Sequence, residues 1–478
     1  ELCDEIVFLR PLGLRLLLFK ENKKVNIKKN DEFVVDIIDD GLEGSGIAKI
    51  DNFTIFINGA IKGERIKIKI IKVLSSHGYG KIIEILNKSE HRKNPDCMTY
   101  TRCGGCSLRH VNYDYTLKIK KEIVKNVLRK QGLDYIKVND VLGMESPFFY
   151  RNKLQYPVGM DIGKKMVMGI FSKRSHNIIN TTKCMIQNEL IQDVANDIFS
   201  FIKNNHISAY DEKNLKGIVR HIVIRIGVKT NEIMCTLILN EDKIDSKLEK
   251  SFIDYILSKY PQIKTIIKNI NNKNTNVILG DKNIVLYGDG YIYDEILGYK
   301  FKISNMSFYQ VNPIQTEVLY SKAIEYASLK GEETIFDLYC GIGTIGICAS
   351  KNVKKLYGIE TIKEAIDDAK ENAKLNNIKN ADFFVGDVEK KLPEFIKENN
   401  IKPDVVFIDP PRKGCEKIAI DTILNITPKK VVYVSCNPAT LARDLKLFEE
   451  KYNIKEVTPV DMFPFTSHVE CVAILCLK

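Results

Sequence analysis

The stretch Asp337-Leu338-Tyr339-Cys340-Gly341-Ile342-Gly343-Thr344-Ile345-Gly346 contains three glycines in the pattern Gly-x-Gly-x-x-Gly. It follows the apolar run 334–338 and leads into a segment that can form a helix. Glycines at these positions allow backbone amides to approach a nucleotide bound at the carboxyl end of a strand. Taken alone, the pattern is also compatible with a dinucleotide-binding fold, or with a turn whose glycines serve only packing.

The residues around this loop alternate between strand-like and helix-like patterns. Helices are expected between the strands, for example over 362–375. This alternation predicts a doubly wound, mostly parallel α/β sheet of the Rossmann-like class over residues 301–478. The expected strands are 334–338, 355–359, 382–385, 405–408, 430–435 and 469–477.

Acidic residues follow three of these strands. Glu360 ends the second strand and can accept hydrogen bonds from two ribose hydroxyls, and Asp387 follows the third, where an acid can bind an adenine amine. Asp409 ends the fourth strand in Asp-Pro-Pro-Arg. Together these acids favour an S-adenosylmethionine-dependent methyltransferase over an NAD-dependent oxidoreductase, which remains a rival.

Cys436 is the candidate nucleophile, in the run Ser435-Cys436-Asn437-Pro438 at the end of the fifth strand. A thiolate that adds to C6 of uracil makes C5 nucleophilic towards a methyl donor, and a base must then remove the C5 proton. Glu470, at the start of the last strand, is the candidate base, although it could equally be a solvated edge residue. The alternative for a lone cysteine is a small buried hydrophobe, our interpretation of Cys235, Cys348, Cys471 and Cys476.

The sequence resembles the RNA uracil-5-methyltransferases, which methylate uridine in tRNA or 23S rRNA. The resemblance extends from about residue 30 to 478 and is carried by residues 337–346, 409–414, 435–444 and 461–470. It implies that Cys436 is the nucleophile and Glu470 the base. It also implies a cofactor pocket lined by Gln310, Tyr339, Glu360, Asp387 and Asp409. Related cytosine-5 enzymes place the nucleophile after a proline, and no proline precedes a cysteine here, so uracil is favoured.

Three cysteines lie close together at Cys97, Cys103 and Cys106, and Cys184 lies further along the chain. From spacing alone, the four thiols could bind zinc or an iron–sulfur cluster, or be unrelated. The resemblance implies the [4Fe–4S] cluster of the 23S rRNA members. Because methyl transfer needs no electron, we expect such a cluster to be structural or to position RNA.

Residues 30–90 contain short β-branched runs separated by glycine-rich turns, which predicts a small β-barrel. The segment resembles the TRAM domain, an OB-like RNA-binding barrel. Residues 91–300 are expected to form an α+β central domain with the cysteine site and an RNA-binding surface. In that domain, the segments 149–153 and 217–221 resemble RNA-contacting segments of the family. Residues 1–29 are expected to be a leader, disordered or wrongly assigned.

The net charge is +11, and basic blocks over 61–93, 102–130 and 146–185 precede the glycine loop. Such blocks are typical of a protein that binds a polyanion, here RNA. The twelve scattered cysteines, without a secretory signal or a membrane span, predict a cytoplasmic protein. We expect a monomer.

The sequence therefore predicts S-adenosylmethionine-dependent methylation of uridine C5 in RNA, with 23S rRNA as the preferred substrate. A tRNA uracil-5-methyltransferase is the nearest alternative, and such enzymes generally lack both the barrel and the cluster. A non-catalytic RNA-binding or ribosome assembly factor is an alternative from another class.

Overall fold

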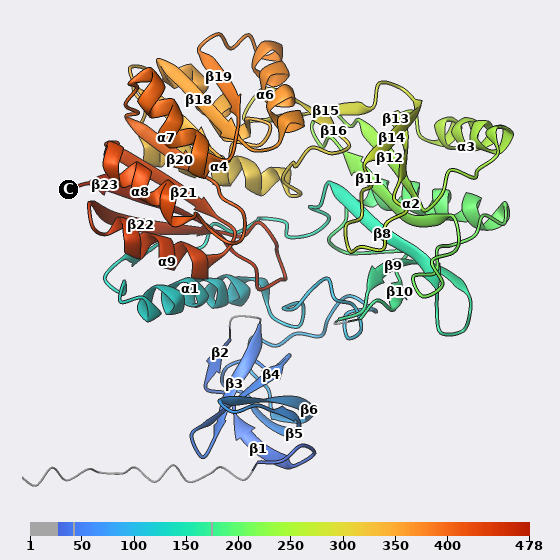
Figure 1. The fold of residues 1–478 in the computed structure, drawn as a ribbon. Helices are drawn as coiled ribbons and strands as arrows, with labels where there is room; N and C mark the ends of the chain where they lie inside the picture. The colour runs from blue at the N-terminus through green and yellow to red at the C-terminus, as the bar shows by residue number, and fades with distance from the viewer. Residues whose placement is uncertain (1–26, 42–43, 174) are drawn as a thin grey trace, which may run out of the picture.

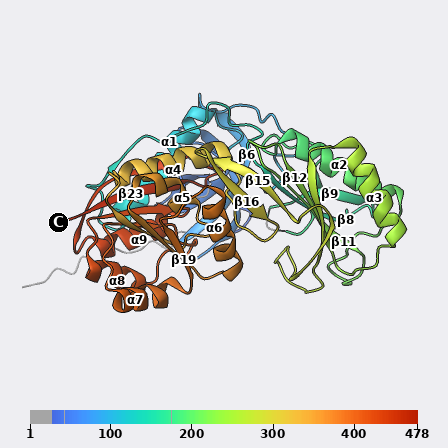
Figure 2. The ribbon, with the colours of Figure 1, turned by 90° about the horizontal axis from the view of Figure 1, so that it is seen from above.

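The computed structural model describes residues 27–41, 44–173 and 175–478. The expected leader over residues 1–29 therefore lies almost wholly outside the described residues. Figure 1 shows three bodies: an N-terminal barrel, a central sheet with helices, and a C-terminal sheet between helices. Figure 2, the view from above, shows the central and C-terminal bodies side by side.

The N-terminal barrel is one six-stranded sheet in the order β1-β5-β6-β4-β3-β2. In β5, Ile66, Ile68 and Ile70 are fully buried while the residues between them point outward, which is the two-residue period of a strand with one face on a core. This confirms the predicted OB-like barrel. Its strands are β1 (Glu32–Asp36), β2 (Asp39–Asp40), β3 (Ser45–Ile50), β4 (Phe53–Asn58), β5 (Arg65–Val73) and β6 (His77–Asn87).

The central body is a seven-stranded sheet in the order β10-β9-β8-β11-β12-β13-β14. Helices α2 (Glu189–Asn204) and α3 (Ser246–Lys259) supply part of its core. Helix α2 begins after Asn188, whose side chain accepts hydrogen bonds from the backbone N–H groups of Leu190 and Ile191. The strands are β8 (Lys153–Met160), β9 (Met166–Phe171), β10 (Ile178–Asn180), β11 (Val219–Ile226), β12 (Ile233–Leu239), β13 (Ile263–Ile270) and β14 (Lys282–Tyr287).

The C-terminal body is an eight-stranded sheet in the order β19-β18-β17-β20-β21-β23-β22-β7. Strands β17 to β21 are parallel, whereas β23 is antiparallel to both of its neighbours. This confirms the predicted doubly wound, mostly parallel sheet. Its strands are β17 (Thr334–Leu338), β18 (Lys355–Glu360), β19 (Ala381–Val385), β20 (Val405–Ile408), β21 (Lys430–Ser435), β22 (Tyr452–Val460) and β23 (Glu470–Leu477).

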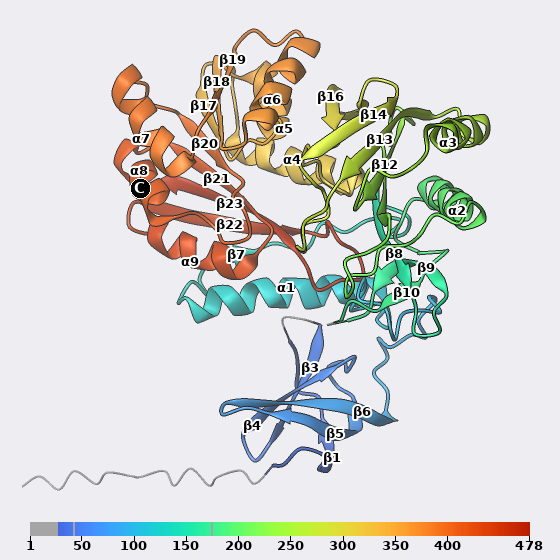
Figure 3. The same cartoon turned by 45° about the vertical axis from the view of Figure 1, so that its right-hand side comes forward.

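Two segments that the sequence analysis placed in the central domain pack on the C-terminal sheet. Strand β7 (Lys137–Val138) pairs with β22 at the edge of that sheet. Helix α1 (Tyr113–Lys130) buries Ile119, Ile123 and Val127 in the same core as α9 (Pro438–Phe448). In Figure 3, α1 runs between the C-terminal sheet and the barrel. The helix therefore connects the barrel side of the molecule to the C-terminal body.

Helices α4 (Pro313–Ala327) to α9 complete the C-terminal body. The others are α5 (Thr344–Ala349), α6 (Lys363–Leu375), α7 (Val388–Asn399) and α8 (Lys417–Ile426). A hairpin of β15 (Tyr291–Ile296) and β16 (Tyr299–Ser304) precedes α4 and shares a core with it. Among the residues that the structure describes, no helix is both long and apolar enough to cross a membrane.

Candidate active site

One edge of the C-terminal sheet collects most of the predicted site residues. The parallel strands β17, β18, β20 and β21 all end at this edge, and Tyr339, Glu360, Asp409 and Cys436 stand at those ends. Strand β23 runs the opposite way, so its first residue lies at the same edge: Ser435 pairs with Cys471, beside Glu470. The antiparallel last strand therefore brings Glu470 next to Cys436.

The nucleophile candidate is fixed between β21 and α9. Asn437 caps this helix by accepting a hydrogen bond from the N–H of Ala439 at 3.1 Å, and Pro438 is the first helical residue, where its missing N–H costs nothing. Cys436 is partly exposed and immediately precedes this cap. The N-terminus of α9 therefore follows Cys436 directly, and a helix N-terminus close to a thiol favours the thiolate form.

Acidic neighbours act in the opposite direction on Cys436. Burial, then the carboxyl groups of Glu470 and Asp409, raise its pKa to about 11, and the Arg412 guanidinium lowers it in part. Burial and Asp409 raise the pKa of Glu470 to about 8, again against Arg412. Burial raises the pKa of Asp409 to about 7. The four groups thus form one electrostatic cluster, with too little positive charge to keep all three acids ionised at neutral pH.

The glycine loop is held by a buried carboxylate. Asp337 has no exposed surface, and its Oδ2 accepts a hydrogen bond from the N–H of Gly346 at 2.8 Å. A Cβ on Gly346 would lie 2.8 Å from that oxygen, so only glycine fits there. Burial raises the pKa of Asp337 to about 7, and its Oδ1 has no partner. No role was predicted for Asp337 from the sequence, although it lies nine residues before the last glycine of the loop.

Two of the predicted cofactor residues contact the loop or its neighbours. Glu360 accepts a hydrogen bond from the N–H of Gly341 at 3.2 Å, which joins the acid to the glycine loop. Tyr339 has a positive φ of 62°, unusual for an aromatic residue, and its hydroxyl donates to Glu389 at 2.7 Å. Both side chains therefore border the space over the ends of β17 and β18.

Two further predicted cofactor residues, Asp387 and Gln310, lie at the ends of neighbouring elements. Asp387 is exposed and caps α7 by accepting a hydrogen bond from the N–H of Glu389 at 3.2 Å. Gln310 precedes α4, and its carbonyl accepts a hydrogen bond from Asn152 at 3.1 Å. For both residues, these contacts are structural, and they leave a cofactor role as an expectation.

The four predicted cysteine ligands line one small hollow, together with Arg109. In the described ranges, no group of three or more Cys, His, Asp or Glu side chains converges closely enough to hold a single metal ion. A cluster is wider than one ion, so its thiolates need not meet at a point.

Unpaired donors surround the hollow. Arg109 is 1% exposed, and neither terminal nitrogen of its guanidinium has a hydrogen-bond partner. Buried donors without acceptors are rare. Four thiols facing such donors fit a group that carries negative charge and several acceptor atoms.

The comparisons with known proteins agree with this geometry. The family model described as tRNA (Uracil-5-)-methyltransferase matches residues 112–478, and the TRAM domain model matches residues 23–83. The chain belongs to the tRNA (uracil-5-)-methyltransferase family. It therefore has the fold of an S-adenosylmethionine-dependent RNA methyltransferase with an N-terminal TRAM domain.

Relatives in this family match over nearly the whole chain. An RNA methyltransferase of Clostridium acetobutylicum, described as uncharacterized, is 48% identical over 95% of this chain and 98% of its own. One from Staphylococcus aureus, described in the same way, is 46% identical over 95% and 99%. The crystal structure of Pyrococcus abyssi tRNA (uracil-54, C5)-methyltransferase with S-adenosyl-L-homocysteine matches with a TM-score of 0.73 and 26% identity, over 93% of this chain and all of that one.

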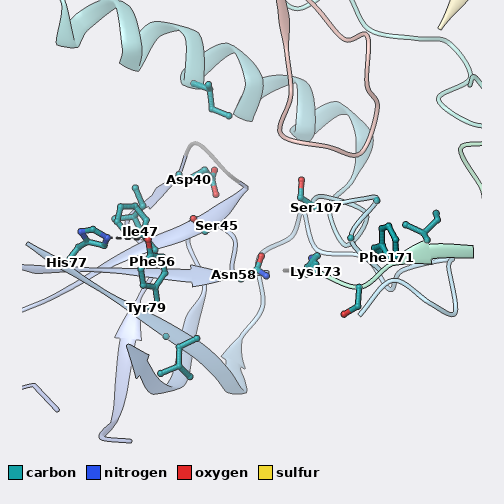
Figure 4. Close-up of a pocket in the computed structure, with 18 of the residues that line it drawn as sticks. Asp40, Ser45, Ile47, Phe56, Asn58, His77, Tyr79, Ser107, Phe171 and Lys173 are labelled. Carbon is teal, nitrogen blue, oxygen red and sulfur yellow. Dashed lines mark hydrogen bonds between the residues drawn. The ribbon is translucent and has the colours of Figure 1, made fainter. Parts of the chain in front are cut away.

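In this family member, a cleft of about 1280 Å³ is lined by residues of the barrel, of α1 and of the central body. Figure 4 shows Phe56, His77 and Tyr79 on the barrel side and Phe171 and Lys173 opposite them. The ring centroids of Phe56 and His77 are 5.4 Å apart, and those of His77 and Tyr79 are 5.3 Å apart. Aromatic rings opposite basic residues suit stacked bases and phosphates.

The RNA-contacting segments expected from sequence are largely engaged within the protein. Tyr150 is buried and donates to the carbonyl of Pro464 at 3.2 Å. Arg220 is buried and donates to the carbonyls of Asn271 and Lys273 at 2.7 and 2.8 Å. These side chains stabilise loops, so the expectation that they contact RNA is not supported for them. The aromatic wall of the cleft was missed, because its residues come from separate strands.

Proposed function

We propose that this protein methylates C5 of uridine in RNA, with S-adenosylmethionine as methyl donor and Cys436 as nucleophile. The observation that carries the proposal is the register of β21 and β23, which sets Cys436 beside Glu470 at the cofactor edge of the sheet. Glu470 and Asp409 both raise the pKa of Cys436, and Asp409 raises that of Glu470, which supports one shared site.

The chemistry assigns one role to each group. The Cys436 thiolate adds to C6 of uracil, and the electron pair of the 5,6 double bond moves to an enolate that Arg412 can stabilise. S-adenosylmethionine, held by Glu360, Tyr339 and Asp387, would supply the methyl group that C5 takes up. Glu470 then takes the proton from C5, the double bond re-forms, and the C6–S bond breaks to return the thiolate.

The charge of the cofactor fits the acidic cluster. A sulfonium cation near Asp409 would favour the ionised forms of Asp409, Glu470 and Cys436, whose pKa values are all raised by burial. Glu360 would accept hydrogen bonds from the ribose, and Tyr339, Asp387 and Gln310 would complete the cofactor pocket. The residues present therefore suit a cationic nucleoside donor.

We further propose a [4Fe–4S] cluster on Cys97, Cys103, Cys106 and Cys184. The shared hollow of the four thiols and the unpaired donors of Arg109 support it. Every cysteine in the described ranges is free, which supports a reducing, cytoplasmic setting. We also propose that the protein acts as a monomer.

For the substrate we propose 23S rRNA, because the four cysteines follow the pattern of the rRNA members. The barrel does not distinguish rRNA enzymes from tRNA enzymes. The structure of the archaeal tRNA enzyme matches 93% of this chain, and the unmatched 7% is shorter than the barrel, so the match includes part of the barrel. That match makes tRNA the second candidate.

The test is methyl transfer from labelled S-adenosylmethionine to 23S rRNA and tRNA transcripts, with identification of the product nucleoside. Wild-type protein is compared with Cys436→Ala and with Cys476→Ala, which removes a thiol at the opposite edge of the same sheet. We expect 5-methyluridine in 23S rRNA, lost only in Cys436→Ala. Label in tRNA alone would replace the rRNA proposal, and label that survives in Cys436→Ala would overturn the nucleophile.

A further inference from the structure

Phe465 holds a backbone conformation that aromatic residues rarely adopt. It has no exposed surface and a positive φ of 62°. It lies in residues 461–469, between β22 and β23, which we call the catalytic loop because Glu470 follows it directly. A bulky residue with positive φ persists only where its surroundings hold it in place, and such residues cluster at functional sites.

The surroundings that hold Phe465 belong to the cysteine segment. The backbone N–H groups of Ser107 and Leu108 both donate to the carbonyl of Phe465, at 3.0 and 2.9 Å. The N–H of Ser467 donates to the hydroxyl of Ser107 at 2.9 Å. Ser107 thus bonds both to the carbonyl of the strained residue and to the N–H of Ser467, which lies 360 positions away in the sequence.

The ring of Phe465 is held as firmly as its backbone. The guanidinium of Arg109 lies 4.5 Å from the ring centroid, and the ammonium of Lys93 lies 4.9 Å from it. The ring of Phe148 lies 5.6 Å away. Cations over an aromatic face attract it, more strongly when shielded from water. The backbone and the ring of one residue are therefore both bound by the segment that follows Cys106.

We propose that Ser107 is a positioning residue: it clamps the catalytic loop so that Glu470 stands where it can take the proton from C5. The inference rests on the proposed role of Glu470 as the base. Addition of Cys436 and methyl transfer do not need Glu470, whereas elimination does. A loosened clamp should therefore slow the last step selectively and let the methylated, covalent protein–RNA adduct accumulate.

The first test uses Ser107→Ala, which removes the bond to Ser467 but keeps the backbone donors, with Ser107→Thr as the conservative variant. Ser200→Ala is the matched control, because Ser200 bonds only to the carbonyl of Asn196 in the exposed face of α2. With ordinary uridine RNA and S-adenosylmethionine, we expect kcat to fall roughly 10- to 100-fold. In Ser107→Ala, we expect KM for the cofactor to stay unchanged. A denaturant-stable protein–RNA adduct should accumulate, as it should in Glu470→Gln. Ser107→Thr should restore turnover.

The second test is hydrogen exchange, which needs no substrate. Residues 461–469 should exchange faster in Ser107→Ala than in wild type, while β17 and β18 stay unchanged. Unchanged exchange and turnover would overturn the clamp, and so would a loss of turnover without adduct. If wild-type protein methylates no RNA, the proposed function fails, and the exchange of residues 461–469 still decides whether Ser107 holds the loop.

Discussion

Lys120 and Asp461 form an ion pair in which neither side chain has any exposed surface. Lys120 belongs to α1, and Asp461 begins the catalytic loop. The ammonium of Lys120 also donates to the carbonyl of Phe463 at 3.0 Å, and the hydroxyl of Tyr113 donates to Asp461 at 2.7 Å. Helix α1 therefore fixes the start of the loop whose end carries Glu470.

Replacing Lys120 by Met should destabilise the protein strongly, because it leaves a buried carboxylate without its partner. Loss of one partner of a buried pair typically costs about 3–5 kcal/mol. Denaturant unfolding should show this loss, whereas Lys118→Met, on the exposed side of the same helix, should change stability by less than about 0.5 kcal/mol. A double variant Lys120→Met/Asp461→Leu should recover most of the stability, and its failure to do so would show that the pair is not the cause.

Glu470→Gln should stabilise the protein, and more so as the pH rises. The pKa of Glu470 is raised from 4.5 to about 8, so the folded state binds a proton that the unfolded state has lost. The part of the wild-type stability that depends on protonation of Glu470 is therefore fully present below about pH 4.5 and is lost as the pH rises towards 8. The neutral amide avoids this loss. Thermal unfolding from pH 4 to pH 8 would measure the difference in stability between Glu470→Gln and wild type. A difference that does not change with pH would refute the raised pKa of Glu470.

A cationic cofactor analogue should lower the pKa of Cys436 from about 11. Sinefungin carries an amine in place of the sulfonium, whereas S-adenosylhomocysteine is neutral at that position. The rate of alkylation of Cys436 would be followed by peptide mass spectrometry across a range of pH. We expect the pH at the midpoint of this rate profile to fall by roughly one unit or more with sinefungin only. An equal shift with both ligands would show that burial, and not charge, controls the thiol.

Phe56→Ala should weaken RNA binding without changing cofactor binding, because Phe56 lies in the aromatic wall of the cleft. Loss of one stacked base costs about 1–3 kcal/mol. Ile83→Ala, which removes an exposed apolar side chain of the same barrel outside the cleft lining, is the control. Fluorescence anisotropy with single-stranded RNA at two salt concentrations would measure both variants. Equal affinity for Phe56→Ala and wild type would exclude the cleft as an RNA site.

Protein purified without oxygen should contain iron and acid-labile sulfide in equal amounts, and Cys103→Ser should lose both. Cys476→Ser should keep them, because Cys476 lies in β23 and does not line the hollow. Loss of the proposed cluster in Cys103→Ser should also speed hydrogen exchange in the catalytic loop, since Ser107 follows the proposed ligand Cys106. Zinc in place of iron, or no metal, would contradict the cluster.

The sequence predicted the catalytic sheet well because its signals are local. The strands that carry Asp409 and Cys436 were placed at 405–408 and 430–435, where the structure has them. Each is a short apolar run followed by a turn residue, and parallel strands of this kind are buried on both faces. The shared edge then followed from topology alone.

Contacts between distant segments could not be predicted in the same way. Nothing in the sequence near Ser107 indicates a bond to Ser467, and the basic, amphipathic pattern of α1 does not say which sheet it covers. The segments that contain Tyr150 and Arg220 were expected to contact RNA because they resemble family segments, yet both side chains are buried against loop carbonyls. Residue type alone does not distinguish a side chain that binds RNA from one that stabilises a loop within the protein.

Strand β23 lies between β21 and β22, although it follows both in the chain. A chain still being synthesised, with β22 made and β23 not yet made, would therefore expose two unpaired strand edges. Such edges favour pairing with other chains. Nascent chains of this protein should accordingly depend on the ribosome surface or on chaperones until the last strand inserts. Insertion closes the sheet and brings Glu470 to the edge that carries Cys436, so the strand edges become protected in the same event that completes the proposed site.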